Sequence, residues 1–112
     1  MDTFQVIVTP DAEADLREIR NYISEVLLAP QAARNYLHFM GEQIGKLGYL
    51  GESIAPVSDE PWHSKGVRRI VAKNFLIYFR IDKADKTVYV LNVIYGKRDQ
   101  LSALKRMDLY ED

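Results

Sequence analysis

The segment KGVRRIVAKNFLIYFRIDKADKTVYVLNVIYGKRDQ, from Lys65 to Gln100, is the most informative part of this sequence for its architecture. It holds three runs enriched in Val, Ile, Phe and Tyr, at 67–71, 75–81 and 87–95, and this enrichment is typical of β-strands. The connections AKN and DKADK are as short as hairpin turns. The segment therefore predicts three antiparallel strands in a meander.

Upstream of the meander, the sequence predicts one strand and two helices. The alternating FQVIVT at 4–9 is typical of a strand. In the following TPDAEADLREIRNYISEVL, Thr9 or Asp11 can cap a helix and Pro10 fits its first turn. A second helix is expected from Pro30, and the two apolar stripes predict an αα-hairpin. The stripe positions are Leu16, Ile19, Tyr22, Ile23 and Val26, then Ala33, Tyr36, Leu37, Met40, Ile44 and Leu47.

The predicted element order is β-α-α-β-β-β, which indicates a single α+β domain over residues 1–112. We expect both helices to pack on one face of the four-stranded sheet, because two helices cannot wrap both faces. The opposite face is then expected to be solvated and to carry the basic residues of the C-terminal half. Residues 51–66 contain many turn formers and are expected to form a loop, and residues 100–107 one or two helical turns.

Charge is distributed unevenly along the chain. Residues 1–60 contain four Lys/Arg and ten Asp/Glu, whereas residues 61–107 contain eleven Lys/Arg and three Asp. The basic part is therefore a candidate surface for phosphates or acidic proteins, unless the two parts neutralise each other within the molecule.

Composition argues against several classes of protein. The chain has no cysteine, which excludes disulfides and thiol chemistry and fits a reducing cytoplasm. The acidic N-terminus is unlike a signal peptide, and no stretch reaches the roughly 18 apolar residues of a membrane span. Metal-ligand spacing, a phosphate-binding glycine loop and a nucleophile elbow are also absent from the sequence. We therefore expect no membrane association, no metal and no cofactor.

Alternation along the strands assigns side chains to the two faces of the sheet. The middle strand has a wholly apolar set that should face the helices, which leaves Arg80 on the opposite face. Alternation does not decide whether Arg68 or Arg69 reaches that opposite face. The sets expected to share a face are Phe75, Ile77, Phe79 and Ile81 in the middle strand, and Val88, Val90, Asn92 and Ile94, or Tyr89, Leu91, Val93 and Tyr95, in the last strand.

Cations and tyrosines on an open sheet face can bind a polyanion, because Arg and Lys hold phosphates and Tyr stacks on bases. Any solvated sheet face carries polar residues, so the alternative is a surface that only solubilises the sheet. GKRD is the more specific signal, since its two cations adjoin a glycine that permits close approach of the backbone. The candidate binding residues are Arg68, Arg69, Lys73, Arg80, Tyr95, Lys97 and Arg98.

Three segments, VIVTPDAEADLREIRNYI, VRRIVAKNFLIYFRID and NVIYGKRD, together resemble the RelE/ParE superfamily of toxins from type II toxin–antitoxin pairs, the plasmid stabilisation type of protein. The resemblance extends over residues 4–104. It implies a cytoplasmic toxin that inhibits growth and assembles with a cognate antitoxin into a hetero-oligomer. RelE-type members enter the ribosome and cleave mRNA, whereas ParE-type members poison DNA gyrase and lack the basic cluster.

Compared residue by residue, some positions agree with the RelE-type branch and others depart from it. Arg98 corresponds to the Arg that RelE-type enzymes use near the scissile phosphate, and Arg68 and Arg69 fall where those enzymes have basic residues. Phe75 stands where RelE-type sequences have an Arg, and Leu104 where they have a C-terminal Tyr. The leading prediction is therefore a ParE-like toxin that binds gyrase.

Two alternatives accompany this prediction. The first is a ribosome-dependent mRNA endonuclease, in which Arg98, Arg69 and His63 are the catalytic candidates, and His63 or Tyr95 helps to move protons. The second is a non-toxic family member that only binds its antitoxin.

Overall fold

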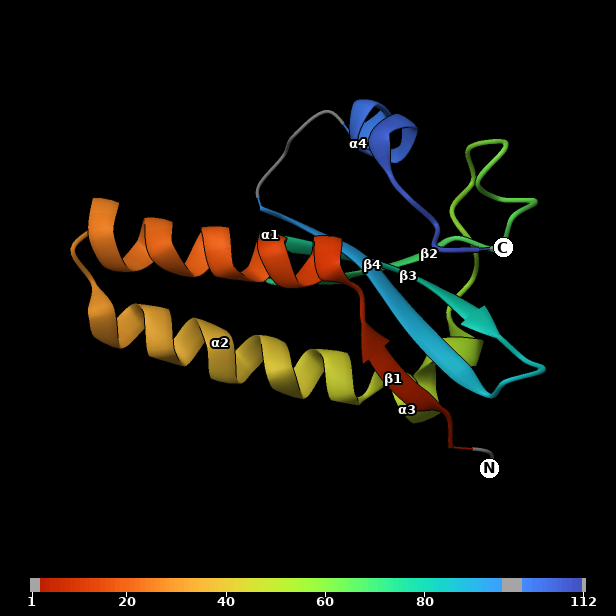
Figure 1. Cartoon of the computed structure of the whole chain (residues 1–112), viewed down its shortest axis with the longest axis horizontal. Coiled ribbons are helices and arrows are strands. Elements are labelled where there is room, and N and C mark those ends of the chain that lie inside the picture. The colour runs from red at the N-terminus through yellow and green to blue at the C-terminus, as the bar shows by residue number, and fades with distance from the viewer. Residues whose placement is uncertain (1–2, 96–99, 112) are drawn as a thin grey trace.

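The computed structural model describes residues 3–95 and 100–111 and has the predicted α+β order (Figure 1). The first strand, the αα-hairpin and the meander are all present, so the predicted fold class is confirmed. No helix in these two ranges has the length and apolarity needed to cross a bilayer. The main elements are β1 (Gln5–Val8), α1 (Pro10–Asn21), a π-helical turn (Tyr22–Val26), α2 (Pro30–Gly45), α3 (Leu47–Leu50), β2 (Arg68–Ala72), β3 (Phe75–Asp82), β4 (Thr87–Tyr95) and α4 (Gln100–Arg106).

The four strands form one mixed sheet in the order β1-β4-β3-β2. The meander pairs β2 with β3, and β3 with β4, in antiparallel register. β1 lies parallel to β4, from Gln5 opposite Thr87 to Val8 opposite Val90. This parallel pair joins the two ends of the fold, because the helical hairpin and most of the meander lie between β1 and β4 in the sequence.

The α1–α2 hairpin covers one face of the sheet (Figure 1). The stripe of α2 is largely buried there, as its spacing predicts. The stripe of α1 is only partly used, since Tyr22 and Val26 are 46% and 64% exposed. The end of the hairpin projects beyond the sheet, which is why these two side chains find no core to enter. The buried core on this face comprises Phe4, Ala12, Tyr36, Met40, Ile44, Leu47, Ala72, Phe75, Ile77, Phe79, Val88, Val90 and Val93.

The opposite face of the sheet is not solvated, so that expectation is wrong. Tyr78 and Leu91 lie on this face and are both 0% exposed. Leu104 of α4 and Leu109 of the C-terminal tail pack over them. The chain after β4 thus supplies the apolar cover that the two main helices cannot. The second cluster comprises Val67, Leu76, Tyr78, Leu91, Leu104 and Leu109, with Val57, Trp62, Tyr89, Ile94, Met107 and Tyr110 packed against it.

A β-bulge in β4 changes which side chains face the hairpin. In the pairing of β4 with β3, Leu91 is skipped between Val90 and Asn92. One extra residue reverses the alternation beyond it. Val93 therefore packs with Val88 and Val90 in the core beneath the hairpin, and Ile94 packs against the opposite cluster. The two predicted sets of the last strand are thus wrong beyond the bulge, because Val93 and Ile94 have exchanged faces.

Two polar side chains attach α1 to the edge of β4. Thr9 is the N-cap of α1, one of the two predicted caps, and its hydroxyl donates to the Val90 carbonyl at 2.7 Å. The Asp15 carboxylate accepts the Val93 N–H at 2.9 Å and the Asn92 side-chain amide at 3.0 Å. Asp15 thus takes the place of a strand partner for β4 where β1 has ended. Burial raises the pKa of the Asp15 carboxyl, and these two hydrogen bonds offset only part of that shift.

Gly48→Ala is expected to destabilise the fold. A Cβ at Gly48 would lie 2.7 Å from the Phe4 carbonyl oxygen, and the Phe4 N–H already donates to the Gly48 carbonyl at 2.7 Å. We expect the free energy of unfolding to fall by about 1–3 kcal/mol, because the clash involves backbone on both sides. Chemical denaturation measures the change. Gly41→Ala is the control: its Cβ would meet nothing within 4 Å, and we expect a gain of about 0.5–1 kcal/mol. Equal losses from both substitutions would contradict the proposed contact.

Asp15→Asn is expected to change how stability depends on pH. The raised pKa of Asp15 means that the folded protein binds more protons than the unfolded chain between pH 3.8 and the folded pKa. The free energy of unfolding should therefore fall as pH rises through that window. Asp15→Asn should remove this slope, because an amide oxygen can still accept the Val93 N–H without titrating. Urea denaturation across acidic to neutral pH measures it. Glu13→Gln, an exposed change on the same helix, should retain the slope.

Candidate functional site

The two arginines of β2 lie on opposite faces of the sheet. Arg68 pairs with Phe79, which belongs to the core beneath the hairpin, and Arg69 pairs with Tyr78 on the other face. The question that alternation left open is thereby settled: Arg69 is the residue on the face away from the helices. The two guanidinium groups therefore do not form one cluster on one face.

Arg68 is occupied by the backbone of the segment that follows α3. One terminal nitrogen of its guanidinium donates to the carbonyls of Gly51 at 3.4 Å, Glu52 at 3.1 Å and Ile54 at 2.6 Å. These carbonyls lie in the turn that ends the helical half of the chain. Arg68 therefore holds this turn against the edge strand, and this group would have to leave the turn to bind a phosphate.

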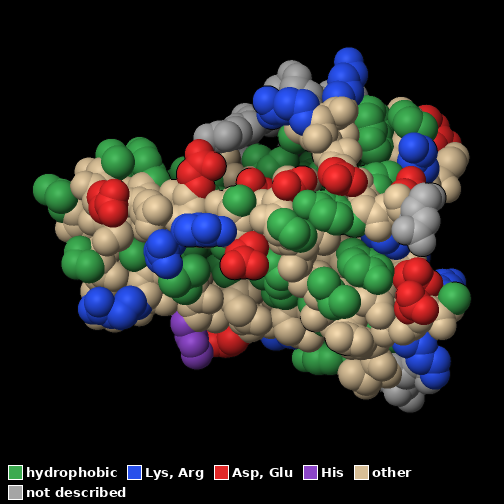
Figure 2. Space-filling view, viewed as in Figure 1, with side chains coloured by type: hydrophobic (Ala, Val, Ile, Leu, Met, Phe, Trp, Pro, Cys, Tyr) green, Lys and Arg blue, Asp and Glu red, His purple; other side chains and the backbone are tan. Residues whose placement is uncertain are grey.

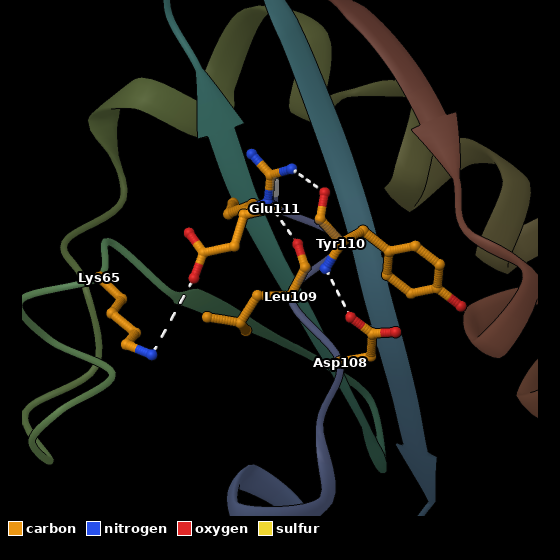
Figure 3. Close-up of polar contacts among 6 residues, drawn as sticks. Lys65, Asp108, Leu109, Tyr110 and Glu111 are labelled. Carbon is orange, nitrogen blue, oxygen red and sulfur yellow. Dashed lines mark hydrogen bonds and ion pairs between the residues drawn. The ribbon is translucent and has the colours of Figure 1, made fainter.

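Arg80 is occupied by the C-terminal tail. Its Nε donates to the Leu109 carbonyl at 2.5 Å and an Nη donates to the Tyr110 carbonyl at 2.6 Å, while the guanidinium lies 4.3 Å from the centre of the Tyr89 ring. Within the tail, the Asp108 carboxylate accepts the Tyr110 N–H at 2.8 Å (Figure 3). The tail covers the face on which Arg80 lies, so the expectation that Arg80 lies on an open face is wrong.

The remaining described candidates lie at the other end of the strands. Lys73 is in the β2–β3 turn, and its ammonium group lies 4.1 Å from the centre of the Phe39 ring. Tyr95 ends β4 and contacts Phe75 with ring centres 5.2 Å apart, because the bulge has turned it to the hairpin face. The predictions for Lys97 and Arg98 fall outside the residues that the structure describes.

The two residues considered for proton transfer, His63 and Tyr95, come from different elements of the fold. His63 lies in the loop before β2, with Nδ1 2.8 Å from the Val57 carbonyl oxygen. Phe75 and Leu104 are 7% and 2% exposed, so both positions are used for packing. Within residues 3–95 and 100–111, no group of three or more His, Cys, Asp or Glu side chains could hold a metal ion.

A groove between α1 and α4 was not predicted. It has a volume of about 540 Å³ and runs across the end of β4. The α1 stripe forms one wall, and Ala103 and Met107 at α4 form the other. One feature of the sequence indicates such a groove. The apolar stripe of the first helix continues to Val26, so it is longer than the short strands can cover. The lining residues are Asp15, Glu18, Ile19, Tyr22, Ile23, Asn92, Val93, Ile94, Tyr95, Ala103, Arg106 and Met107.

The groove combines an apolar lining with opposite charges on its walls. Asp15 and Glu18 lie on the α1 side and Arg106 on the α4 side. The charge of Glu18 adds to the burial that raises the pKa of the Asp15 carboxyl. None of the lining residues is a Ser, Cys, His or Lys of the kind that covalent catalysis uses. The chemistry of the groove therefore fits the binding of a peptide segment with apolar and charged side chains.

Comparison with known proteins gives the same fold. Residues 6–100 match the family model described as the ParE toxin of type II toxin–antitoxin system, parDE. No curated protein matches the chain. A chain from the chromosomal ParDE system of P. aeruginosa is 24% identical, with a TM-score of 0.70 over 85% of this chain and 98% of that chain. A chain of the toxin–antitoxin complex RelBE2 from Mycobacterium tuberculosis is 21% identical, with a TM-score of 0.57 over 83% of this chain and 98% of that chain.

These two likenesses support the architecture. The family model shows family membership as well, because its match over residues 6–100 includes both the hairpin and the meander. The protein belongs to the ParE toxin family of type II toxin–antitoxin systems.

Proposed function

We propose that this toxin arrests growth by binding DNA gyrase in the cytoplasm and that it does not cleave RNA. One observation on the described residues carries the proposal: Arg68 and Arg69, both expected to hold RNA, lie on opposite faces of the sheet, and Arg68 and Arg80 are bound to backbone carbonyls. The family match supports gyrase as the target, because ParE-type toxins are the gyrase-binding branch.

The requirements of RNA cleavage support the same choice. In-line attack by a ribose 2′-OH needs cations around the phosphate and groups that move protons. Phe75 and Leu104 occupy the two positions where RelE-type enzymes have an Arg and a Tyr, and both are buried apolar side chains. An Arg at position 75 or a Tyr at position 104 would bury a charge or a hydroxyl in the core, which is unfavourable. The packing of this protein therefore favours the apolar residues that it has at these two positions.

We further propose that the cognate antitoxin binds in the α1–α4 groove and forms a hetero-oligomer with the toxin. The two similar structures are described as toxin–antitoxin systems, which makes an antitoxin the expected partner here. The groove supports this seat because it offers apolar walls with Glu18 on one side and Arg106 on the other. A segment with apolar residues and flanking charges of both signs would match it.

The gyrase proposal predicts two results. The purified toxin should inhibit supercoiling by gyrase, and induction in a bacterial host should leave mRNA intact while a DNA-damage response develops. Supercoiling assays measure the first outcome, and primer extension on ribosome-bound mRNA, with a reporter of DNA damage in the same cells, measures the second. Ribosome-dependent mRNA cleavage that Arg98→Ala slows by about 10²–10³-fold would instead support the endonuclease alternative.

The groove proposal predicts that charge reversal at Arg106 weakens antitoxin binding. Arg106→Glu should raise the dissociation constant about tenfold or more, because it places a carboxylate where the groove now offers a cation. Lys105→Glu makes the same charge change at the neighbouring exposed residue of α4, which does not line the groove. Isothermal titration with the antitoxin encoded beside the toxin compares the two variants. Equal weakening would mean that only overall charge matters.

A further inference from the structure

The end of the α1–α2 hairpin exposes large apolar side chains. Tyr22, Val26, Leu27 and Leu28 are 46%, 64%, 53% and 80% exposed, and they follow one another around the turn between the helices. We call these four residues the hairpin tip. Figure 2 shows the hydrophobic side chains gathered at the left end of the molecule, where α1 and α2 meet in Figure 1. Exposed apolar clusters of this kind mark interaction sites on soluble proteins.

The backbone of the tip is unfavourable for the residue that it presents. Leu28 has a φ of 52°, in the left-handed region where Gly or Asn is favoured. The turn is held by the Leu27 N–H donating to the Tyr22 carbonyl and the Ala29 N–H donating to the Ile23 carbonyl, both at 3.1 Å. Neither of these hydrogen bonds needs a leucine side chain at position 28. Folding alone therefore does not explain why a leucine is placed there and left exposed.

Two arginines border the tip. Arg20 of α1 and Arg34 of α2 both line a shallow hollow between the helices behind the turn. Arg20 donates to the Asn21 side-chain oxygen at 3.1 and 2.9 Å, and Arg34 to that of Gln31 at 2.6 Å. Both acceptors are neutral amides. Within the described part of the chain, neither guanidinium forms an ion pair with a carboxylate.

We propose that the hairpin tip is the anchor by which the toxin docks on its protein target, inserting into an apolar pocket that is bordered by carboxylates. The apolar residues match the pocket, and the charges of Arg20 and Arg34 match an acidic border. This inference rests on the proposed function only in taking the target to be a protein.

A second copy of the chain is unsuited as the partner that binds the hairpin tip. A stable interface buries about 800 Å² per partner from some 20–30 residues, and the tip offers four. A few apolar residues can nevertheless dominate a larger heterologous interface when each fills a pocket. A convex tip at the end of the long axis of the molecule is suited to such insertion (Figure 1).

The test compares Leu28→Asn with a matched pair of serine substitutions. Leu28→Asn removes the most exposed apolar side chain of the tip and suits the left-handed backbone, so thermal stability should be unchanged or higher. Growth arrest on induction, and gyrase inhibition in vitro, should need about tenfold or more toxin. Val26→Ser should act in the same direction. Val71→Ser is the control, because Val71 is 65% exposed on β2 and Val26 is 64% exposed at the tip.

The outcomes separate this inference from the gyrase proposal. Growth arrest that is weakened by Leu28→Asn and Val26→Ser but not by Val71→Ser, without any gyrase inhibition by the parent protein, supports the tip and refutes gyrase as the target. Full potency of both tip variants would refute the proposal that the tip docks on the target, whatever the target is. A parent protein that arrests no growth overturns both proposals. Binding of the parent protein, but not of Leu28→Asn, to phosphatidylglycerol vesicles would replace the protein target by a membrane.

Discussion

The attachment of α1 to the edge of β4 is the constraint on which the rest of the structure depends. Thr9 caps the helix and bonds the Val90 carbonyl, and Asp15 takes over the Val93 N–H where β1 no longer reaches. These contacts close the fold between its two ends, because β1 and β4 are distant in sequence. They also set the direction in which the hairpin leaves the sheet. One wall of the groove and the position of the hairpin tip both follow from that direction.

The bulge at Leu91 and the C-terminal tail together decide where polar groups are available. The bulge turns Tyr95 toward the hairpin, and the tail covers the face on which Arg80 lies. Two of the arginines in the basic strands consequently bind other parts of the same chain. Arg68 holds the turn after α3 and Arg80 holds the tail, each through backbone carbonyls. Cationic composition is therefore a poor guide to polyanion binding in this fold, since charge-assisted hydrogen bonds to backbone carbonyls use the same residues.

A toxin that acts by binding needs surfaces, and the described residues offer two of different shape. The α1–α4 groove is concave, and both of its charged walls are set by helices. The hairpin tip is convex, apolar and bordered by Arg20 and Arg34. A concave seat suits a segment that folds onto the toxin, whereas a convex tip suits insertion into a preformed pocket. Tyr22 belongs to both surfaces, so an antitoxin bound in the groove would lie next to the tip.

The sequence by itself determined the types and order of the elements and the core face of β3, and it limited the cap of α1 to Thr9 or Asp11. These features follow from residue propensities and from the periods of 3.6 and 2, which are properties of short segments. It also indicated the family through motifs of fixed order. Only the tertiary structure decided the parallel place of β1, the reversal after Leu91 and the covered second face. It also decided the partners of Arg68 and Arg80, and the exposure of the last turns of the hairpin. Each of these depends on contacts between residues far apart in the chain, such as Thr9 with Val90 and Arg80 with Leu109, and no local pattern specifies such contacts.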